Sequence, residues 1–285
     1  MLSSGHLFKA VKINLTYKAG GTVLILNMAT WNINSIRLRA DLVCKVLKNH
    51  EIDLLCLQEC KSPVEKIPLD LFSEIGFPHL VARGQKGYNG VAIISRLPIK
   101  EHSAIDFADL GHARHIAASL ENGIIIHNFY VPAGGDVPDR INNEKFDQKL
   151  TYLSEMRQYF HKNTPKKSIL VGDLNIAPLP EDVWDHKKMA KVVSHTQVEV
   201  DHLNAVKRAG AWVDVTRKDF PNQKLYSWWS YRAKDWNAVD RGRRLDHIWA
   251  SSDIVSSVSG SRILREARGW DKPSDHVPVF ATIDL

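Results

Sequence analysis

The sequence predicts an α/β domain with a mixed, two-sheet core. Short apolar runs rich in β-branched residues, typical of buried strands, alternate with segments whose apolar residues recur at helical spacing. Some expected strands follow one another directly, as at 115–120 and 124–129, which the turn Asn122-Gly123 joins. Helices between strands favour an α/β fold, and the adjacent strand pairs argue against a purely parallel sheet.

The N-terminal half is expected to begin with a strand at 23–31. A helix follows, because Leu38, Leu42 and Val46 form one apolar stripe. A short helix at 69–75 is ended by Gly76. The other strands expected in this half lie at 52–57, 91–95, 115–120 and 124–129.

The C-terminal half is expected to open with a helix at 141–161, which places Phe146, Leu150 and Leu153 on one face. A buried strand starts at Ser168, and a second helix lies around 200–209. Residues 226–244 form an aromatic and basic loop. The remaining expected strands are 212–215, 245–250, 258–264 and 277–283.

No linker, repeat or low-complexity segment interrupts this pattern, so residues 23–285 are expected to form a single domain. Residues 1–22 show no clear periodicity and are interpreted as a poorly ordered N-terminal extension. They lack the apolar core and cleavage site of a signal peptide. No apolar run approaches the roughly 18 residues of a membrane span. We therefore expect a cytoplasmic protein that is independent of membranes.

Charge and cysteine content set further bounds. The net charge of +6 is compatible with a polyanionic partner and equally with an ordinary solvated surface. Three cysteines, Cys44, Cys56 and Cys60, do not have the even number or spacing of a disulfide framework. A zinc site at Cys56 and Cys60 would lack its second pair of ligands.

Polar residues that can support catalysis stand where the expected strands end. The run Ser168 to Val171 stops at Gly172, and Asp173 and Asn175 follow two positions apart. Side chains alternate in an extended chain, so these two share one face, at the strand end where α/β folds place their chemistry. Taken alone, this segment is better explained as a turn rich in Asp and Asn.

Other strand ends carry similar groups, namely Asn32, Glu59, Tyr130, Asp246, Asp275 and His276. Each has an ordinary structural explanation, such as a helix cap for Asn32 or a surface charge for Glu59. Such explanations do not predict functional side chains at so many strand ends. Carboxylates and amides without cysteine favour Mg²⁺ or Mn²⁺ over zinc. Together with a His–Asp pair they suit metal-assisted phosphodiester hydrolysis.

The motifs occur in the order found in a known family. They are Trp31-Asn32-Ile33-Asn34, Leu57-Gln58-Glu59, Gly87-Tyr88-Asn89-Gly90-Val91, Gly172-Asp173-Leu174-Asn175, Arg244-Leu245-Asp246 and Ser274-Asp275-His276. From about Leu26 onward the chain resembles the exonuclease III family of AP endonucleases, in the wider endonuclease/exonuclease/phosphatase superfamily. The resemblance implies a four-layer α/β sandwich, in which two mixed β-sheets pack face to face with helices outside.

The resemblance also implies roles for individual residues. The implied metal-binding set is Asn32, Glu59, Asp173, Asn175, Asp275 and His276, with Glu59 as the main Mg²⁺ ligand. The implied catalytic set is Tyr130, Asp173, Asn175, Asp246 and His276. Asp173 would activate or orient the attacking water, and His276, held by Asp246, would bind the phosphate. Whether Asp173 or the His276–Asp246 pair takes the proton stays open from sequence.

The implied reaction is hydrolysis 5′ to an abasic site, with related 3′-end trimming, by a monomer acting on double-stranded DNA. Binding to DNA would associate the protein with the nucleoid. The residues expected to contact DNA are Arg37, Lys86, Trp228, Arg232, Arg243 and Leu245, with Arg39 and Arg241 as further candidates. Trp228 and Leu245 resemble residues that line a pocket for an extrahelical abasic sugar. Ordinary core packing is the alternative for the tryptophans, and Trp249 inside an expected strand fits it better.

Three positions depart from the family pattern. Ser35 stands in place of a usual glycine, and Ala133 in place of a side-chain amide that often helps to bind phosphate. His195 lies where relatives border the lesion pocket, and we hypothesise that it crowds an abasic sugar and favours 3′-end trimming. Two other functions compete with the nuclease: a superfamily phosphatase acting on a phosphoester such as inositol phosphate, and a non-catalytic DNA-binding member.

Overall fold

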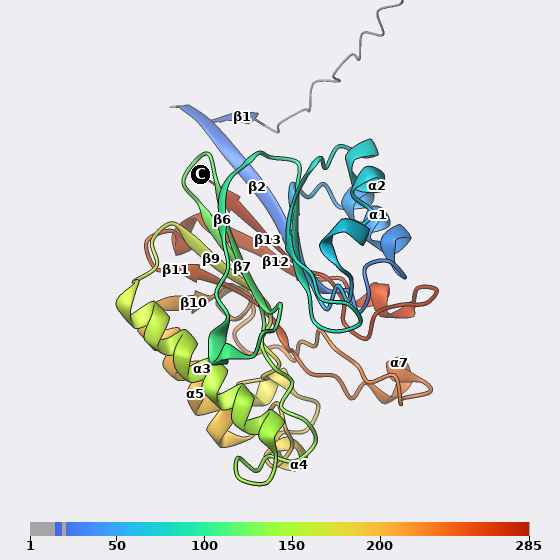
Figure 1. The fold of residues 1–285 in the computed structure, drawn as a ribbon, viewed down its shortest axis with the longest axis vertical. Helices are drawn as coiled ribbons and strands as arrows, with labels where there is room; N and C mark the ends of the chain where they lie inside the picture. Colours follow the sequence, from blue (N-terminus) through green and yellow to red (C-terminus); the bar gives the residue numbers. More distant parts are fainter. Residues whose placement is uncertain (1–14, 19–20, 285) are drawn as a thin grey trace, which may run out of the picture.

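The structure is a computed structural model that describes residues 15–18 and 21–284. Two sheets pack face to face, with helices α1 (Ala40–Asn49) and α2 (Leu69–Glu74) on one side and α3 (Glu144–Lys162) and α5 (Gln197–Ala209) on the other (Figure 1). This arrangement confirms the predicted four-layer α/β sandwich. Shorter helices lie in the connecting segments: α4 (His186–Met189), α6 (Val215–Asp219) and α7 (Trp236–Val239).

Within the described residues, the first sheet has seven strands. Its strands are β1 (Leu15–Lys18), β2 (Gly21–Asn32), β3 (Leu54–Gln58), β4 (His79–Arg83), β5 (Val91–Ser95), β12 (Val258–Ile263) and β13 (Val279–Asp284). The spatial order is β12-β13-β2-β3-β5-β4, and β1 pairs with β2. β2 and β3 run parallel, and the other pairs are antiparallel. The sheet is therefore mixed, as expected.

The second sheet has six strands in the part of the chain that the structure describes. They are β6 (Ile99–Ser103), β7 (His115–Leu120), β8 (Ile125–Tyr130), β9 (Ser168–Asp173), β10 (Trp212–Asp214) and β11 (Asp246–Ser251), in the order β10-β11-β9-β8-β7-β6. Only the β8–β9 pair is parallel among the pairs described in this sheet. The hairpin predicted at Asn122-Gly123 joins β7 to β8.

The central strands are apolar on both faces because both faces are covered. In β3, Leu54 and Cys56 point into the layer between the sheets, while Leu55 and Leu57 face the layer of α1 and α2. All four side chains are fully buried. This double burial explains why the strand appears in the sequence as a continuous apolar run without polar alternation.

Sequence reasoning missed β4 and β6, each of which lies at one edge of its sheet. β6 has the sequence Ile-Lys-Glu-His-Ser and is mostly exposed, so it carries no apolar pattern that would reveal a strand. Within the expected N-terminal extension, Leu15–Lys18 form β1, antiparallel to β2. Gly21 and Thr22 of that extension begin β2, and residues 1–14, 19 and 20 lie outside the described part of the chain.

No helix within residues 15–18 and 21–284 combines the length and the apolar character needed to cross a membrane.

A buried histidine pair predicts how stability responds to acid. The rings of His115 and His127 stack, and their Nε2 and Nδ1 atoms are 3.2 Å apart. Burial lowers the pKa of His127 from 6.5 to about 4. Between these values the unfolded chain binds a proton that the folded chain does not, so stability falls as pH drops from 6.5 to 4. At roughly 1.4 kcal/mol per pKa unit, the loss is about 3 kcal/mol.

We expect His127→Gln, which cannot take up this proton, to make that part of the profile of unfolding free energy against pH less steep; His115, whose pKa burial also lowers, keeps the rest of the slope. Urea unfolding between pH 4 and 7 measures it. His102→Gln, on the exposed strand β6, is the matched control and should retain the wild-type slope. Equal slopes for His127→Gln and the wild type would contradict the prediction.

Candidate active site

Sheet topology brings the predicted side chains to one end of the sandwich. In the second sheet, Asp173 at the end of β9 lies opposite Tyr130 of the parallel strand β8 and opposite Asp246 of the antiparallel strand β11. In the first sheet, Asn32 at the end of β2 pairs with Gln58, which directly precedes Glu59. His276 lies just before β13, the antiparallel neighbour of β2. Residues far apart in sequence therefore meet where the two sheets end together.

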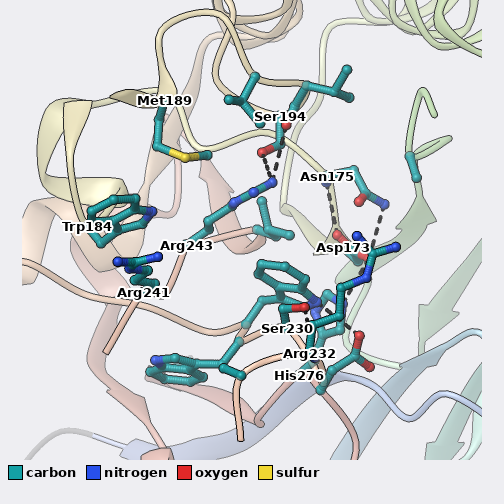
Figure 2. Close-up of a pocket in the computed structure, with 18 of the residues that line it drawn as sticks. Asp173, Asn175, Trp184, Met189, Ser194, Ser230, Arg232, Arg241, Arg243 and His276 are labelled. Carbon is teal, nitrogen blue, oxygen red and sulfur yellow. Dashed lines mark hydrogen bonds and ion pairs between the residues drawn. The ribbon is translucent and has the colours of Figure 1, made fainter. Parts of the chain in front are cut away.

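Asp173 lies at the centre of this group and is 1% exposed. Its Oδ2 atom accepts hydrogen bonds from Asn32 Nδ2 at 2.9 Å and from Asn175 Nδ2 at 3.1 Å. Its Oδ1 atom accepts from the backbone N–H of Asn175 at 2.9 Å. The Nε2 atom of His276 lies 3.6 Å from Oδ2. The expected convergence of Asp173, Asn175 and His276 is thus present (Figure 2).

The backbone around Asp173 explains the Gly-Asp-x-Asn pattern. Gly172 has a φ of +134°, and a Cβ there would lie 1.9 Å from the carbonyl oxygen of Phe129 on β8. Only glycine permits this close approach of β8 and β9. Asn175 has a φ of +53°, a left-handed conformation that asparagine tolerates better than most residues. This turn directs the Asn175 side chain back to Asp173.

Glu59 forms the opposite side of the group. Its Oε1 atom accepts from Asn32 Nδ2 at 3.0 Å and from the Tyr130 hydroxyl at 2.8 Å. Its Oε2 atom lies 2.8 Å from Lys61 Nζ. Burial alone would raise the pKa of Glu59, but Lys61 and the two other donors outweigh it and lower that pKa. Glu59 is therefore a carboxylate at neutral pH.

His276 and Asp246 form the expected pair. The His276 Nδ1 atom lies 2.8 Å from Asp246 Oδ2, so Nδ1–H donates and Nε2 is directed to Asp173. Burial alone lowers the pKa of His276, but the carboxylates of Asp246 and Asp173 outweigh burial and raise it to about 10. The ring is therefore an imidazolium at neutral pH, with a proton on Nε2.

The pKa of Asp173 is raised, whereas an aspartate beside a positive charge usually has a lowered pKa. Burial raises the pKa of Asp173 to about 7, although the positive charge of His276 opposes this rise. A carboxyl group with a pKa near neutrality can accept a proton and release it again, which is the property of a general base. The pKa of Tyr130 is raised well above 10 by burial and by Glu59, so its hydroxyl stays protonated and donates.

The described residues include a group whose atoms are close enough to hold a divalent cation once His276 has lost its Nε2 proton. Asp173, Asp246 and His276 each offer a ligand atom, and these atoms lie within 4.8 Å of one another. The Oδ1 atom of Asp246 is buried and has no hydrogen-bond partner among the described residues. Asn32 is turned with its NH₂ group toward Glu59 and Asp173, while its oxygen accepts from the Asn34 N–H. In this orientation it holds the two carboxylates together.

Asp275 lies at the edge of the group. Its Oδ1 atom accepts from Asn34 Nδ2 at 3.1 Å and its Oδ2 atom from Trp228 Nε1 at 3.0 Å. Asn34 also accepts from Lys61 Nζ at 2.6 Å. A chain of contacts through Asn34 and Lys61 therefore joins Asp275 to Glu59. Sequence reasoning missed Lys61, although its place two residues after Glu59 was an available signal.

The active-site group borders a cleft of about 840 Å³. Its members in the cleft lining are Glu59, Tyr130, Asp173, Asn175, Asp275 and His276. Figure 2 shows Asp173, Asn175 and His276 gathered on one side of the cleft, facing Arg243 and Ser194 across the opening. Trp184, Met189 and Arg241 lie farther along the wall. A second cavity of about 570 Å³ also borders Glu59, Tyr130, Ala133 and Gly135, so the two hollows meet at Tyr130.

Several of the residues expected to contact DNA line the cleft: Trp228, Arg232, Arg241, Arg243 and Leu245. The Arg243 guanidinium lies 4.9 Å from the centre of the Trp228 ring and donates to Ser194 Oγ at 2.9 Å. Arg37 and Lys86 are exposed and lie outside this lining. Trp249 is buried in the core, as predicted.

Two expectations are wrong. Arg39 is 8% exposed and is not available to a phosphate, because its guanidinium donates to the carbonyls of Asn34 and Lys272. His195 does not crowd the cleft, because its ring is buried. Its Nε2 atom lies 2.8 Å from His186 Nδ1, and its Nδ1 atom lies 2.5 Å from the Ala177 carbonyl oxygen. Its neighbour Ser194 lines the cleft instead.

The departures at Ser35 and Ala133 have simple structural outcomes. Ser35 has a φ of +89°. Glycine adopts such a positive φ more readily than other residues, which explains why glycine is usual in this loop. Ala133 lines the cleft with a methyl group, so this position offers a phosphate no side-chain donor.

A sequence profile of the Endonuclease/Exonuclease/phosphatase family matches residues 29–276. The chain belongs to this family. It is 29% identical over 271 residues to exodeoxyribonuclease III of Haemophilus influenzae, covering 88% of this chain and 97% of that protein.

Two solved structures of the family are closely similar. An AP endonuclease from Archaeoglobus fulgidus matches with a TM-score of 0.85 and 34% identity, covering 91% of this chain and all of that one. A 3′ phosphatase from Neisseria, bound to a product DNA hairpin, matches with a TM-score of 0.84 and 29% identity over the same shares. These matches confirm the family that the sequence motifs indicated.

The His276–Asp246 pair predicts a pH-dependent stability in this family member. A raised pKa means that the pair stabilises the folded state fully below pH 6.5 and loses this effect as pH rises through about 10. In metal-free protein, Asp246→Asn should lower the pKa of His276, as measured by NMR titration. The stability deficit of the variant should be largest below pH 6.5 and should close above pH 10. Asp271→Asn, at an exposed position, should change neither quantity.

Proposed function

We propose that the protein is a Mg²⁺- or Mn²⁺-dependent DNA repair nuclease of the exonuclease III type. Its substrates are double-stranded DNA with an abasic site, cleaved on the 5′ side, and DNA with a damaged 3′ end. The observation that carries the proposal is the Asp173 carboxylate, held by Asn32, Asn175 and His276 at the floor of a cleft with aromatic and cationic walls.

The metal site of the proposal is centred on Glu59. This carboxylate is ionised and partly exposed at the cleft, and Asp275 is joined to it through Lys61 and Asn34. Among the described residues no cysteine lines the cleft, and its oxygen-bearing side chains suit Mg²⁺ or Mn²⁺. When bound, the ion supplies charge stabilisation to the phosphoryl group. Glu59 would hold it as main ligand, with Asp275 nearby.

The protonation states support a division of roles. Asp173, with a pKa of about 7, is suited to accept the proton of the attacking water. His276 already carries a proton on Nε2 and is suited to donate a hydrogen bond to a phosphate oxygen. Asn175 holds the acceptor oxygen of Asp173 in place. Tyr130 is a neutral donor to Glu59 and so is not suited to act as a nucleophile.

The cleft walls support DNA as the substrate. Trp228, Leu245 and the stacked Arg243 form an apolar and cationic wall beside Asp173, suited to an unstacked sugar with its flanking phosphates. The similar proteins named above are an exodeoxyribonuclease, an AP endonuclease and a DNA-bound 3′ phosphatase. Because His195 is turned away from the cleft, this structure gives it no part in the choice between abasic sites and 3′ ends.

One experiment tests the substrate class and the metal requirement together. Abasic duplex, a 3′-phosphate nick, blunt duplex and inositol phosphate are incubated with Mg²⁺, Mn²⁺ or EDTA. We expect hydrolysis of the damaged DNA with either ion and none with EDTA. Asp173→Asn should lower kcat by roughly 10²- to 10⁴-fold, the usual contribution of a general base, and Glu59→Ala should raise the Mg²⁺ concentration required.

Asp201→Asn, on the exposed side of α5, is the matched control and should retain full activity. Preferential hydrolysis of inositol phosphate would favour the phosphatase alternative. DNA binding without cleavage would favour a non-catalytic member. Unchanged cleavage by Asp173→Asn would rule out the mechanism.

The Trp228–Arg243 wall predicts a separate effect on substrate binding. Trp228→Ala removes the ring on which Arg243 stacks, and a cation–π contact of this kind is worth roughly 0.5–2 kcal/mol. We expect KM for abasic duplex to rise by roughly tenfold, with a smaller change in kcat. Trp228→Phe retains a ring and should fall between wild type and Trp228→Ala. Steady-state kinetics at fixed salt measure KM and kcat separately. Equal changes of kcat in both variants, with KM unchanged, would contradict the prediction.

A further inference from the structure

A buried ion pair lies behind the cleft. Lys149 of α3 and Glu199 of α5 are both 0% exposed, and Lys149 Nζ is 2.5 Å from Glu199 Oε1. Neither residue is among those that line the cleft. Burying two charges costs desolvation energy, and well-packed apolar residues of similar size often stabilise a protein as well or better. The pair therefore calls for an explanation other than stability.

Every donor of the lysine is used. Besides Glu199, Nζ donates to the backbone carbonyl of Asn175 at 2.8 Å and to that of Ala133 at 3.3 Å. An ammonium group has three N–H donors, and these three acceptors match them. Both carbonyls belong to residues that border the cleft. The lysine thus joins the segment after β9 to the segment after β8.

The glutamate holds a third segment. Both of its carboxylate oxygens accept from the Ser194 N–H at 2.9 Å, and Oε2 also accepts from the Thr196 hydroxyl at 2.6 Å. Ser194 in turn accepts from Arg243, the residue stacked on Trp228. One ion pair therefore connects the backbone of Asn175 with the wall that carries Arg243.

Each of the three segments has a residue with a positive φ angle next to the pair. The φ angles are +53° at Asn175, +87° at Ser194 and +90° at Gly134. A left-handed conformation in a residue other than glycine persists only where surrounding contacts fix it. A Cβ at Gly134 would lie 2.9 Å from Lys149 Cδ and 3.2 Å from Val193 Cγ1, so the lysine stem packs tightly against this turn.

We infer that Lys149 and Glu199 are positioning residues of the active site. They fix the backbone at Asn175 so that its amide group faces Asp173, and at Ser194 so that Arg243 stays over Trp228. This role rests on the proposed function and deepens it. The pair supplies directed hydrogen bonds to three loops, which apolar side chains of the same size lack.

The test compares Lys149→Met with Arg157→Met. Both remove a cation from α3, but Arg157 is exposed and remote from the cleft. We expect Lys149→Met to fold and to lower kcat on damaged DNA on the order of 10²-fold, the effect of small misplacements of a reacting group, with a smaller change in KM. Arg157→Met should retain wild-type kinetics. Near-UV circular dichroism and the unfolding midpoint report the folded fraction.

A second measurement needs no substrate. In metal-free protein labelled with ¹⁵N-asparagine, the side-chain NH₂ resonance of Asn175, identified by its loss in Asn175→Asp, should shift in Lys149→Met and stay in place in Arg157→Met. If Lys149→Met does not fold, Lys149→Met/Glu199→Gln, which leaves no unpaired charge, is judged by the same measurements.

An unmoved Asn175 resonance, or a fall in kcat no larger than the fall in folded fraction, would overturn the inference. Failure of the proposed function would look different. Wild-type protein would then hydrolyse none of the DNA substrates, whereas the Asn175 resonance would still decide the positioning role.

Discussion

The fixed place of the Asp173 carboxylate is the constraint on which the rest of the site depends. Gly172 lets β9 approach β8 closely enough to bring Asp173 opposite Tyr130, and β11 places Asp246 on its other side. From the first sheet, Asn32 reaches across to Asp173 and also holds Glu59. The two sheets therefore share one network of hydrogen bonds at their common end, and a shift of either sheet would separate its members.

Burial and nearby charges give Asp173 and His276 pKa values that suit proton transfer. Asp173 and His276 lie in the same buried site, and the pKa of each is raised, that of Asp173 to about 7 and that of His276 to about 10. The carboxyl group is poised to accept a proton while the imidazolium retains its own. This division follows from the position of Asp246, which faces His276 directly and Asp173 only across the strand pair. The proposed reaction uses the same difference, because water must lose a proton while the phosphate gains a hydrogen bond.

The strand-end motifs made the family and much of the site predictable from sequence, because each places its polar residue directly after an apolar run. The convergence of Asn32, Asp173, Asn175 and His276 agrees with that prediction. Residues without such a local signal were misjudged or missed. Arg39 was a candidate phosphate contact, but it is buried and donates to a backbone carbonyl. The His195 ring contacts His186 instead of the cleft. The polar edge strand β6 carries no apolar alternation, so nothing local revealed it.

By itself, the sequence determined the layered α/β fold and the chemical groups at the strand ends, since apolar periodicity and short motifs are local properties of the chain. Only the tertiary structure decided which way each side chain faces and which charges are paired. Lys149 and Glu199 are 50 residues apart, and no local pattern relates them. Their contact depends on how α3 and α5 pack over the second sheet, and such packing is a property of the whole fold.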